Sequence, residues 1–207
     1  MTSRRVAVIV VADSELAFLP LGESSVVATA VERARAADCA REVMVWVAEE
    51  CLASWEALKP ARRPACTVSF IPSLAQLALN ADAEIVLLHE ATRPLTLPAT
   101  FDRVAQAIVD DVTHARPAHV VVDTLKIVDA QDRITGTVNR DEVQSLTSPE
   151  GYRVSAIVSG PAPRGWYLAV SEPSSADFVR GDQESLKVRE PGDVLLVESF
   201  LAWQTRH

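Results

Sequence analysis

The feature of this sequence that most constrains its fold is a series of short apolar runs separated by helical patterns. Residues 5–12 (RVAVIVVA) and 84–89 (EIVLLH) are continuous and rich in β-branched side chains, as in strands covered on both faces. Between them, apolar residues across 26–34 have the spacing of an amphipathic helix that begins at Ser24 or Ser25. This alternation predicts an α/β fold with a mostly parallel sheet and helices on both faces.

The other expected elements continue this alternation as far as residue 122. Further strands are expected at 43–47, 67–71 and 120–122, with helices at 49–58, 72–79 and 101–112. Residues 158–182 are rich in proline, glycine and serine and predict only a short strand at 166–170. Pro191 opens the last expected helix. We find no linker and expect a single domain over 1–207.

After residue 123 the pattern changes from alternating elements to a hairpin. Residues 123–129 and 134–138 are β-prone and are joined by four polar residues, 130–133. A hairpin of two strands is marginally stable in water, so this β-arm, at about 123–150, is expected to pack against something.

Composition excludes several classes of function. The chain has 207 residues, a formal net charge of −8 and 28 acidic against 20 basic side chains, so it lacks the basic surface of nucleic-acid-binding proteins. Its longest apolar run, Val6–Ala12, is too short to span a bilayer, and we expect a cytoplasmic protein that contacts no membrane. The three cysteines lack metal-ligand spacing. Gly22 is the only glycine before Gly136, which excludes a glycine-rich phosphate loop.

Candidate site residues follow the expected strands, where open α/β sheets bind ligands. Glu90 and Arg93, just after 84–89, could hold a divalent cation and an anionic group side by side, although such loop residues are usually only solvated. His89 is expected to be a core residue. A second polar set follows the hairpin strands and precedes the last helix, and its cations could together hold phosphate. It comprises Thr124, Lys126, Arg140, Ser148 and Lys187.

Four segments resemble the 2-C-methyl-D-erythritol 4-phosphate cytidylyltransferase (IspD) family of non-mevalonate isoprenoid synthesis. They are VLLHEATRP (86–94), VVDTLKIVD (121–129), GTVNRDEVQSLTSPEGYR (136–153) and ESLKVREPGDVLLVESFLA (184–202). The resemblance implies a Rossmann-like, glycosyltransferase-A-like nucleotidyltransferase fold and a homodimer whose arms clasp the neighbouring subunit. It also implies attack of methylerythritol phosphate on the α-phosphorus of CTP, with Mg²⁺ neutralising charge and pyrophosphate leaving.

The resemblance also assigns roles to individual residues. Glu90 stands where the family has a metal-binding Asp, and Arg93 matches the family's Arg in the same motif. Thr124 and Arg140 match residues that the arm presents to the phosphorylated substrate in the partner's site. Ser148 replaces a Thr before the family's Pro-Gln-Gly-Phe, and Lys187 matches a lysine near the CTP phosphates. We expect Lys187 and Arg140 to be the catalytic residues, Arg93, Thr124 and Ser148 to bind substrate, and Glu90 to bind metal.

Three segments depart from the family, and all three concern the nucleotide. The family's first strand runs into a glycine-rich turn with Arg and Lys, whereas here it runs into Asp13-Ser14-Glu15, which directs two carboxylates at the phosphate position. The family's Gly-Gly segment for the base is replaced by 71–76, and its Thr-Asp-Asp-Ala segment by the irregular stretch 158–182. The substitution of Glu90 for Asp is milder, because it adds one methylene.

Three hypotheses follow. The preferred one is a catalytically degenerate member with weak or no CTP binding and a structural or regulatory role, as a homodimer or a heterodimer with a complete paralogue. The second is an active enzyme that transfers a nucleotidyl group from an NTP to a sugar or polyol phosphate with Mg²⁺, using Arg93, Lys187 and Arg4 or Arg5. The third is a binding module for a phosphorylated small molecule that uses Arg93, Arg140 and Lys187.

Overall fold

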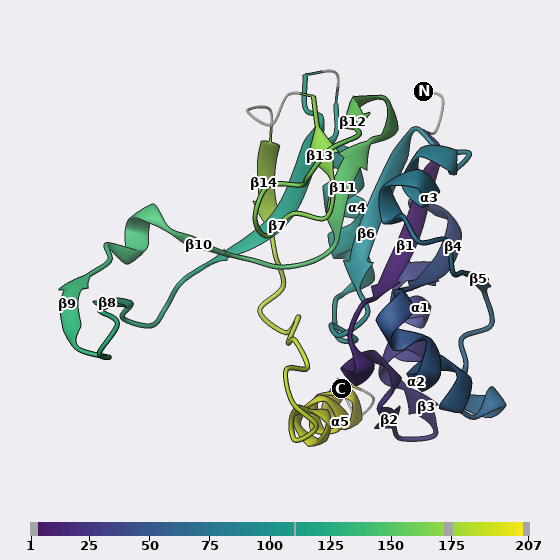
Figure 1. The fold of residues 1–207 in the computed structure, drawn as a ribbon, viewed down its shortest axis with the longest axis horizontal. Helices are drawn as coiled ribbons and strands as arrows, with labels where there is room; N and C mark the ends of the chain where they lie inside the picture. The colour runs from purple at the N-terminus through teal and green to yellow at the C-terminus, as the bar shows by residue number, and fades with distance from the viewer. Residues whose placement is uncertain (1–3, 110, 172–175, 205–207) are drawn as a thin grey trace.

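The computed structural model describes residues 4–109, 111–171 and 176–204. Its centre is an eight-stranded mixed sheet (Figure 1). One half is parallel, in the order β5-β4-β1-β6. These strands are β1 (Val6–Ala12), β4 (Ala40–Val47), β5 (Thr67–Ser69) and β6 (Ile85–Glu90). Strands β1 and β6 are buried at every residue, as their continuous apolar sequences predict.

The other half of the sheet is mixed. Strand β11 (Glu150–Arg153) lies antiparallel between β6 and β7 (His114–Val120). Strand β7 also pairs with β10 (Gln144–Leu146), antiparallel, and with β14 (Ala176–Arg180), parallel. Strands β1, β6, β7 and β14 therefore run in one direction, and their carboxyl ends meet at one edge of the sheet.

Helices cover both faces, as predicted. On one face α1 (Val26–Arg35), α2 (Leu52–Ala57) and α4 (Pro98–Ala107) contribute to the larger core cluster. The opposite face is covered by α3 (Leu74–Asn80) and a small antiparallel pair, β12 (Ile157–Val158) and β13 (Ala169–Val170).

The remaining elements are short or peripheral. The C-terminal helix α5 (Asp193–Gln204) packs near the β2–β3 pair (Pro20–Leu21 and Ser24–Ser25) in a third, smaller cluster. Five 3₁₀ helices complete the described part of the chain: η1 (Glu15–Phe18), η2 (Glu49–Cys51), η3 (Pro60–Arg62), η4 (Arg140–Glu142) and η5 (Val154–Ala156). In the described segments, no helix is both long and apolar enough to cross a membrane.

The predicted hairpin is present and projects from the body as an arm (Figure 1). It consists of β8 (Lys126–Val128) and β9 (Ile134–Thr137). Its apolar side chains lie in solvent: Ile127 is 51% exposed and Ile134 is 67% exposed.

Three of the differences between the expected elements and the structure are the largest. Helix α4 ends at Ala107 instead of continuing to residue 112, because the backbone leaves the helical region at Ile108. The strand expected at 120–122 lies at His114–Val120, where polar residues interrupt the apolar pattern. Within 158–182 the expected short strand is reduced to Ala169–Val170, and β14 completes the sheet without a signal in the sequence.

Candidate functional site

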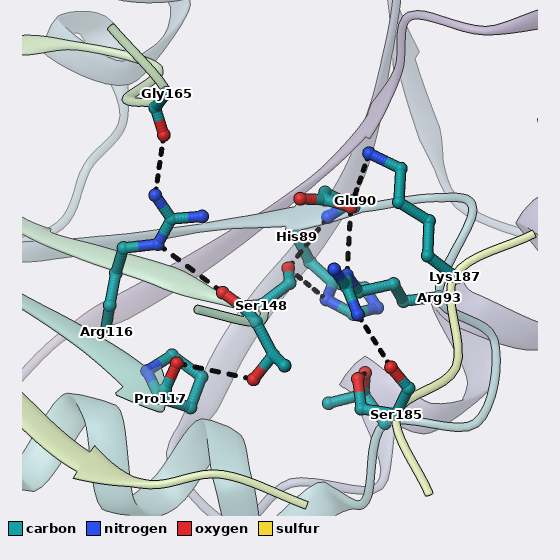
Figure 2. Close-up of polar contacts among 11 residues, drawn as sticks. His89, Glu90, Arg93, Arg116, Pro117, Ser148, Gly165, Ser185 and Lys187 are labelled. Carbon is teal, nitrogen blue, oxygen red and sulfur yellow. Dashed lines mark hydrogen bonds and ion pairs between the residues drawn. The ribbon is translucent and has the colours of Figure 1, made fainter. Parts of the chain in front are cut away.

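Glu90 forms the centre of a charged cluster at the carboxyl end of β6. Its Oε2 lies 2.9 Å from Nε of Arg93 and 3.0 Å from Nζ of Lys187 (Figure 2). Burial by itself would raise the pKa of the Glu90 carboxyl, but the positive charges of Arg93 and Lys187 outweigh burial and lower it. Glu90 is therefore an ionised carboxylate already paired with two cations.

The two cations come from segments far apart in the sequence. Arg93 lies in the turn after β6, and its Nη1 donates to the Ser185 carbonyl oxygen at 2.7 Å (Figure 2). The backbone N–H of Val188 donates to the carbonyl oxygen of Thr92 at 2.8 Å, so the segment that carries Lys187 runs beside the turn that carries Arg93. The structure thus brings together three of the six predicted site residues: Glu90, Arg93 and Lys187.

Ser148 lies beside Glu90 but is buried beneath it. Its Oγ accepts the Glu90 backbone N–H at 2.9 Å and lies 2.8 Å from Nδ1 of His89. Burial lowers the pKa of His89 to about 4, so the imidazole is neutral and the Ser148 hydroxyl can donate to it. His89 is a core residue, as expected, and the Ser148 hydroxyl positions the end of β6.

The turn after β1, Asp13-Ser14-Glu15, contains no glycine and no basic residue. The Ser14 hydroxyl accepts the Leu16 N–H at 3.3 Å and caps η1, which folds the chain directly into a 3₁₀ turn. Desolvation and the nearby Glu90 and Glu50 carboxylates raise the pKa of Asp13, although Lys187 opposes them. Asp13 is exposed just beyond the end of β1, whose Val11 lies in register with Glu90 of β6.

Glu15, the other acid of this turn, lines a separate cavity. That cavity, of about 530 Å³, lies between η1 and the α2–η3 region, and its lining includes Phe18, Lys59 and Arg62. Glu15 therefore lies apart from Glu90, and the expectation that Asp13 faces a phosphate stays a prediction.

The two arm residues lie apart from this cluster within one chain. Thr124 is exposed, and Arg140 donates from Nη1 to the Val122 carbonyl oxygen at 2.8 Å on the projecting arm. Arg4 and Arg5 precede β1, at the opposite edge of the sheet, and Arg5 pairs with Asp82. Seven strand residues separate them from the end of β1, roughly 20 Å at about 3.3 Å per residue, so Arg4 and Arg5 do not lie beside Glu90, Arg93 and Lys187.

A second buried polar group, which the sequence did not reveal, lies on β7 and β11. Oε1 of Glu150 lies 3.1 Å from Nε2 of His114 and 3.3 Å from Nη1 of Arg116. Its Oε2 accepts the Tyr167 backbone N–H at 3.0 Å. All three side chains are at most 8% exposed. The available signal was the alternation of polar with small apolar residues in HARPAH (114–119), before the strand expected at 120–122.

The side chains described above supply only some of the ligands that a metal site needs. In the ranges that the structure covers, no three His, Cys, Asp or Glu side chains form a group that could hold a metal. Asp13 and Glu90 supply two carboxylates, and Mg²⁺ is usually bound by one or two carboxylates together with substrate phosphates. These two residues fit Mg²⁺ only if a phosphate completes its coordination.

Two open cavities lie next to the base of the arm. One, of about 1020 Å³, lies at the ends of β7 and β14, and its lining includes Arg103, His119 and Phe178. The other, of about 720 Å³, shares His119 and is lined on the arm side by Val122 and Leu125. Both are distinct from the Glu90 cluster.

Comparison with known proteins identifies close similarity to one family. The family model for 2-C-methyl-D-erythritol 4-phosphate cytidylyltransferase (IspD) matches residues 9–203. The enzyme of that name from Nocardia farcinica is 31% identical over 203 residues, which are 91% of this chain and 86% of the relative. A Frankia casuarinae protein of the same name is 34% identical over 133 residues, or 60% of this chain, and the match spans about half of its length.

The solved structures agree on the fold. A 4-diphosphocytidyl-2C-methyl-D-erythritol synthase from Anaerococcus prevotii superposes with a TM-score of 0.74 at 16% identity, covering 97% of both chains. The cytidylyltransferase from Thermus thermophilus gives a TM-score of 0.69 at 20% identity, over 96% of this chain and 99% of that one. The predicted Rossmann-like nucleotidyltransferase fold is confirmed.

Proposed function

The chain belongs to the IspD family of cytidylyltransferases of isoprenoid synthesis, and from that premise we propose that it is a catalytically degenerate member that binds Mg-CTP weakly or not at all. Its role is then structural or regulatory. The observation that carries the proposal is the turn after β1, where Asp13 and a capped 3₁₀ helix stand in place of a backbone cradle.

The electrostatics of the site support this proposal. A triphosphate needs backbone N–H groups and cations that are free to face it. Arg93 and Lys187 are the cations at the site, and both are paired with Glu90. Even with effective screening, the repulsion between a phosphate and a carboxylate about 5 Å apart is on the order of a few kcal/mol. The Asp13 carboxylate therefore disfavours binding of a triphosphate at the carboxyl end of β1.

Equilibrium binding tests the proposal directly. Isothermal titration calorimetry with Mg-CTP should give no micromolar association, with the Thermus thermophilus enzyme as a positive control. An Asp13→Asn variant separates charge repulsion from missing contacts, because it removes the acid and keeps the side-chain volume. A micromolar Kd for the natural chain refutes the proposal.

The second candidate is an active nucleotidyltransferase that accepts a different nucleotide and a sugar or polyol phosphate. The observation in its favour is that Glu90, Arg93 and Lys187 gather at the carboxyl end of β6, and that Asp13 follows the neighbouring parallel strand β1. In that reaction Asp13 and Glu90 would hold Mg²⁺, and the metal would neutralise phosphate charge. Pyrophosphate release across a panel of NTPs and sugar or polyol phosphates supports this candidate. No release with any pair removes it. Saturable binding of a phosphorylated metabolite without turnover indicates the third reading, a binding module.

We also propose that the arm pairs with a second copy of the chain. Val122 is 68% exposed and Ile134 is 67% exposed, and an isolated hairpin with these side chains in water is marginal. A partner's arm would cover them and bring Thr124 and Arg140 to the neighbouring site. Ile134→Lys should convert a dimer to a monomer in light scattering. Leu195→Lys on α5, at 70% exposure, is the matched control and should leave the dimer intact.

The same experiment tests the partner. A wild-type monomer that associates only with a complete family member supports the heterodimer. A chain that associates neither with a second copy of itself nor with a complete family member refutes the arm proposal.

A further inference from the structure

The cavity of about 530 Å³ beside η1 is separate from the Glu90 cluster and has no part in the proposed function. One wall is η1, which contributes Glu15 and Phe18. The other wall runs from α2 to η3 and contributes Leu58, Lys59 and Arg62. Cavities that hold small molecules have volumes of roughly 300–1,000 Å³, so this one is large enough for a small ligand.

The apolar part of the cavity lining is firmly packed from behind. Phe18 and Leu58 are each only 7% exposed. The Phe18 ring meets the Trp55 indole of α2 edge to face, with centroids 6.3 Å apart and planes at 76°. Arg63 lies 5.2 Å from the centroid of the same indole and donates to the carbonyl oxygens of Leu58 and Trp55 at 3.1 and 3.2 Å. This apolar surface therefore exists before any ligand binds.

Opposite charges lie on the two walls of the cavity. Glu15 is the acid of the η1 wall, and Lys59 and Arg62 are the cations of the other wall. Across the described ranges, none of these three side chains takes part in an ion pair. The Arg62 guanidinium makes one long hydrogen bond, from Nη2 to the Gly22 carbonyl oxygen at 3.3 Å. All three charges therefore remain available to a ligand.

This arrangement of charges selects among classes of ligand. An anion that binds Lys59 and Arg62 shares the cavity with the Glu15 carboxylate, and a cation that binds Glu15 shares it with two like charges. Two like charges about 5 Å apart repel by on the order of a few kcal/mol near a protein surface. A molecule that carries both an ammonium group and a carboxylate pairs with both walls and avoids this repulsion.

We propose that this cavity binds a small zwitterion with an apolar body, the chemistry of an apolar amino acid or of a dipeptide. The ammonium group pairs with Glu15, the carboxylate pairs with Lys59 and Arg62, and the apolar body packs on Phe18 and Leu58. The wall that carries Glu15 and Phe18 belongs to the segment after β1 that departs from the family, so membership of the family does not imply this site.

Calorimetry with L-phenylalanine and with L-leucyl-L-phenylalanine tests the site and distinguishes the two sources, because the tighter ligand identifies an amino acid or a peptide. The N-acetylated form of each probe lacks the positive charge, and the C-amidated form lacks the negative charge. We expect each modification to weaken binding of the tighter probe at least fivefold. A smaller loss on removing either charge overturns the proposal, as does the absence of saturable binding by both probes at millimolar concentration.

Two variants assign the charges of the ligand to the two walls. Glu15→Gln should weaken binding of the zwitterion at least fivefold and change the affinity for its N-acetylated form less than twofold. Arg62→Gln should weaken binding of the zwitterion and leave the affinity for its C-amidated form within twofold. An equal loss for the zwitterion and the modified form in either variant overturns the proposed pairing, because the side chain then does not act on the charge that was removed.

Glu23→Gln is the matched control, because Glu23 is an exposed acid of the β2–β3 turn that does not line the cavity. It should leave every affinity unchanged, and an equal loss in this variant would show that net charge alone governs binding and would overturn the proposal. Circular dichroism checks that each variant is folded. The outcome is independent of the proposed function, because Mg-CTP binding near Glu90 is measured separately and neither of its results changes the ratios expected here.

Discussion

Gly151 offers a sharp test of how β11 is packed beneath the site. A Cβ at this position would lie 2.6 Å from Cγ1 of Val104, 2.8 Å from Cδ1 of Ile108 and 3.1 Å from Cδ2 of Leu87. These distances are far below van der Waals contact, so Gly151→Ala forces β11 away from α4. The same displacement would move the neighbouring Glu150.

The expected magnitude follows from two opposing effects. Overpacking a filled core costs about 1–3 kcal/mol. Replacing glycine by alanine stabilises by about 0.4–1 kcal/mol where the backbone permits it, because the unfolded chain has fewer conformations. Steric cost is the larger effect, so Gly151→Ala should lower the free energy of unfolding by roughly 1–2 kcal/mol.

Urea unfolding followed by circular dichroism measures this change as a lower midpoint at constant slope. Gly136→Ala on the arm is the matched control, because its Cβ would meet Ile127 at an ordinary 3.4 Å, and it should be neutral or slightly stabilising. Adding Val104→Ala should lower the free energy of unfolding less in the Gly151→Ala variant than in the natural chain, because it makes room for the new methyl group. A Gly151→Ala protein within 0.5 kcal/mol of the natural one, by the scale of overpacking costs, refutes the packing argument.

Three further predictions concern titratable groups. Burial holds the pKa of folded His89 at about 4, against an ordinary 6.5, so unfolding takes up a proton between these values. Stability should therefore fall by roughly 3 kcal/mol as the pH drops through this window, and His89→Gln should show a smaller loss in urea unfolding. Burial and Asp102 raise the pKa of Cys39 to about 12, so its thiol should resist iodoacetamide at pH 8 and react only after denaturation, as mass spectrometry can show. Asp13→Asn should raise pyrophosphate affinity severalfold in calorimetry, because it removes a carboxylate beside Glu90, and unchanged affinity would exclude Asp13 as the repelling group.

The sequence alone determined the elements that depend on local pattern. Strands β1 and β6 followed from continuous β-branched runs, and the arm followed from two β-prone runs with a polar connection. The absence of glycine after Val6–Ala12 excluded a phosphate loop, and η1 stands in that place. Such features depend on backbone propensity and side-chain period, which neighbouring residues define.

Only the tertiary structure decided which polar residues share a site. Lys187 meets Glu90 because the segment before α5 pairs with the turn after β6, nearly a hundred residues earlier. The side chains of Arg116 and Glu150 are only 8% and 1% exposed, whereas charged residues in a sequence are normally expected at the protein surface. Their burial is tolerated because each satisfies the other and both bind the segment that carries Tyr167, a compensation between distant residues that local pattern does not encode.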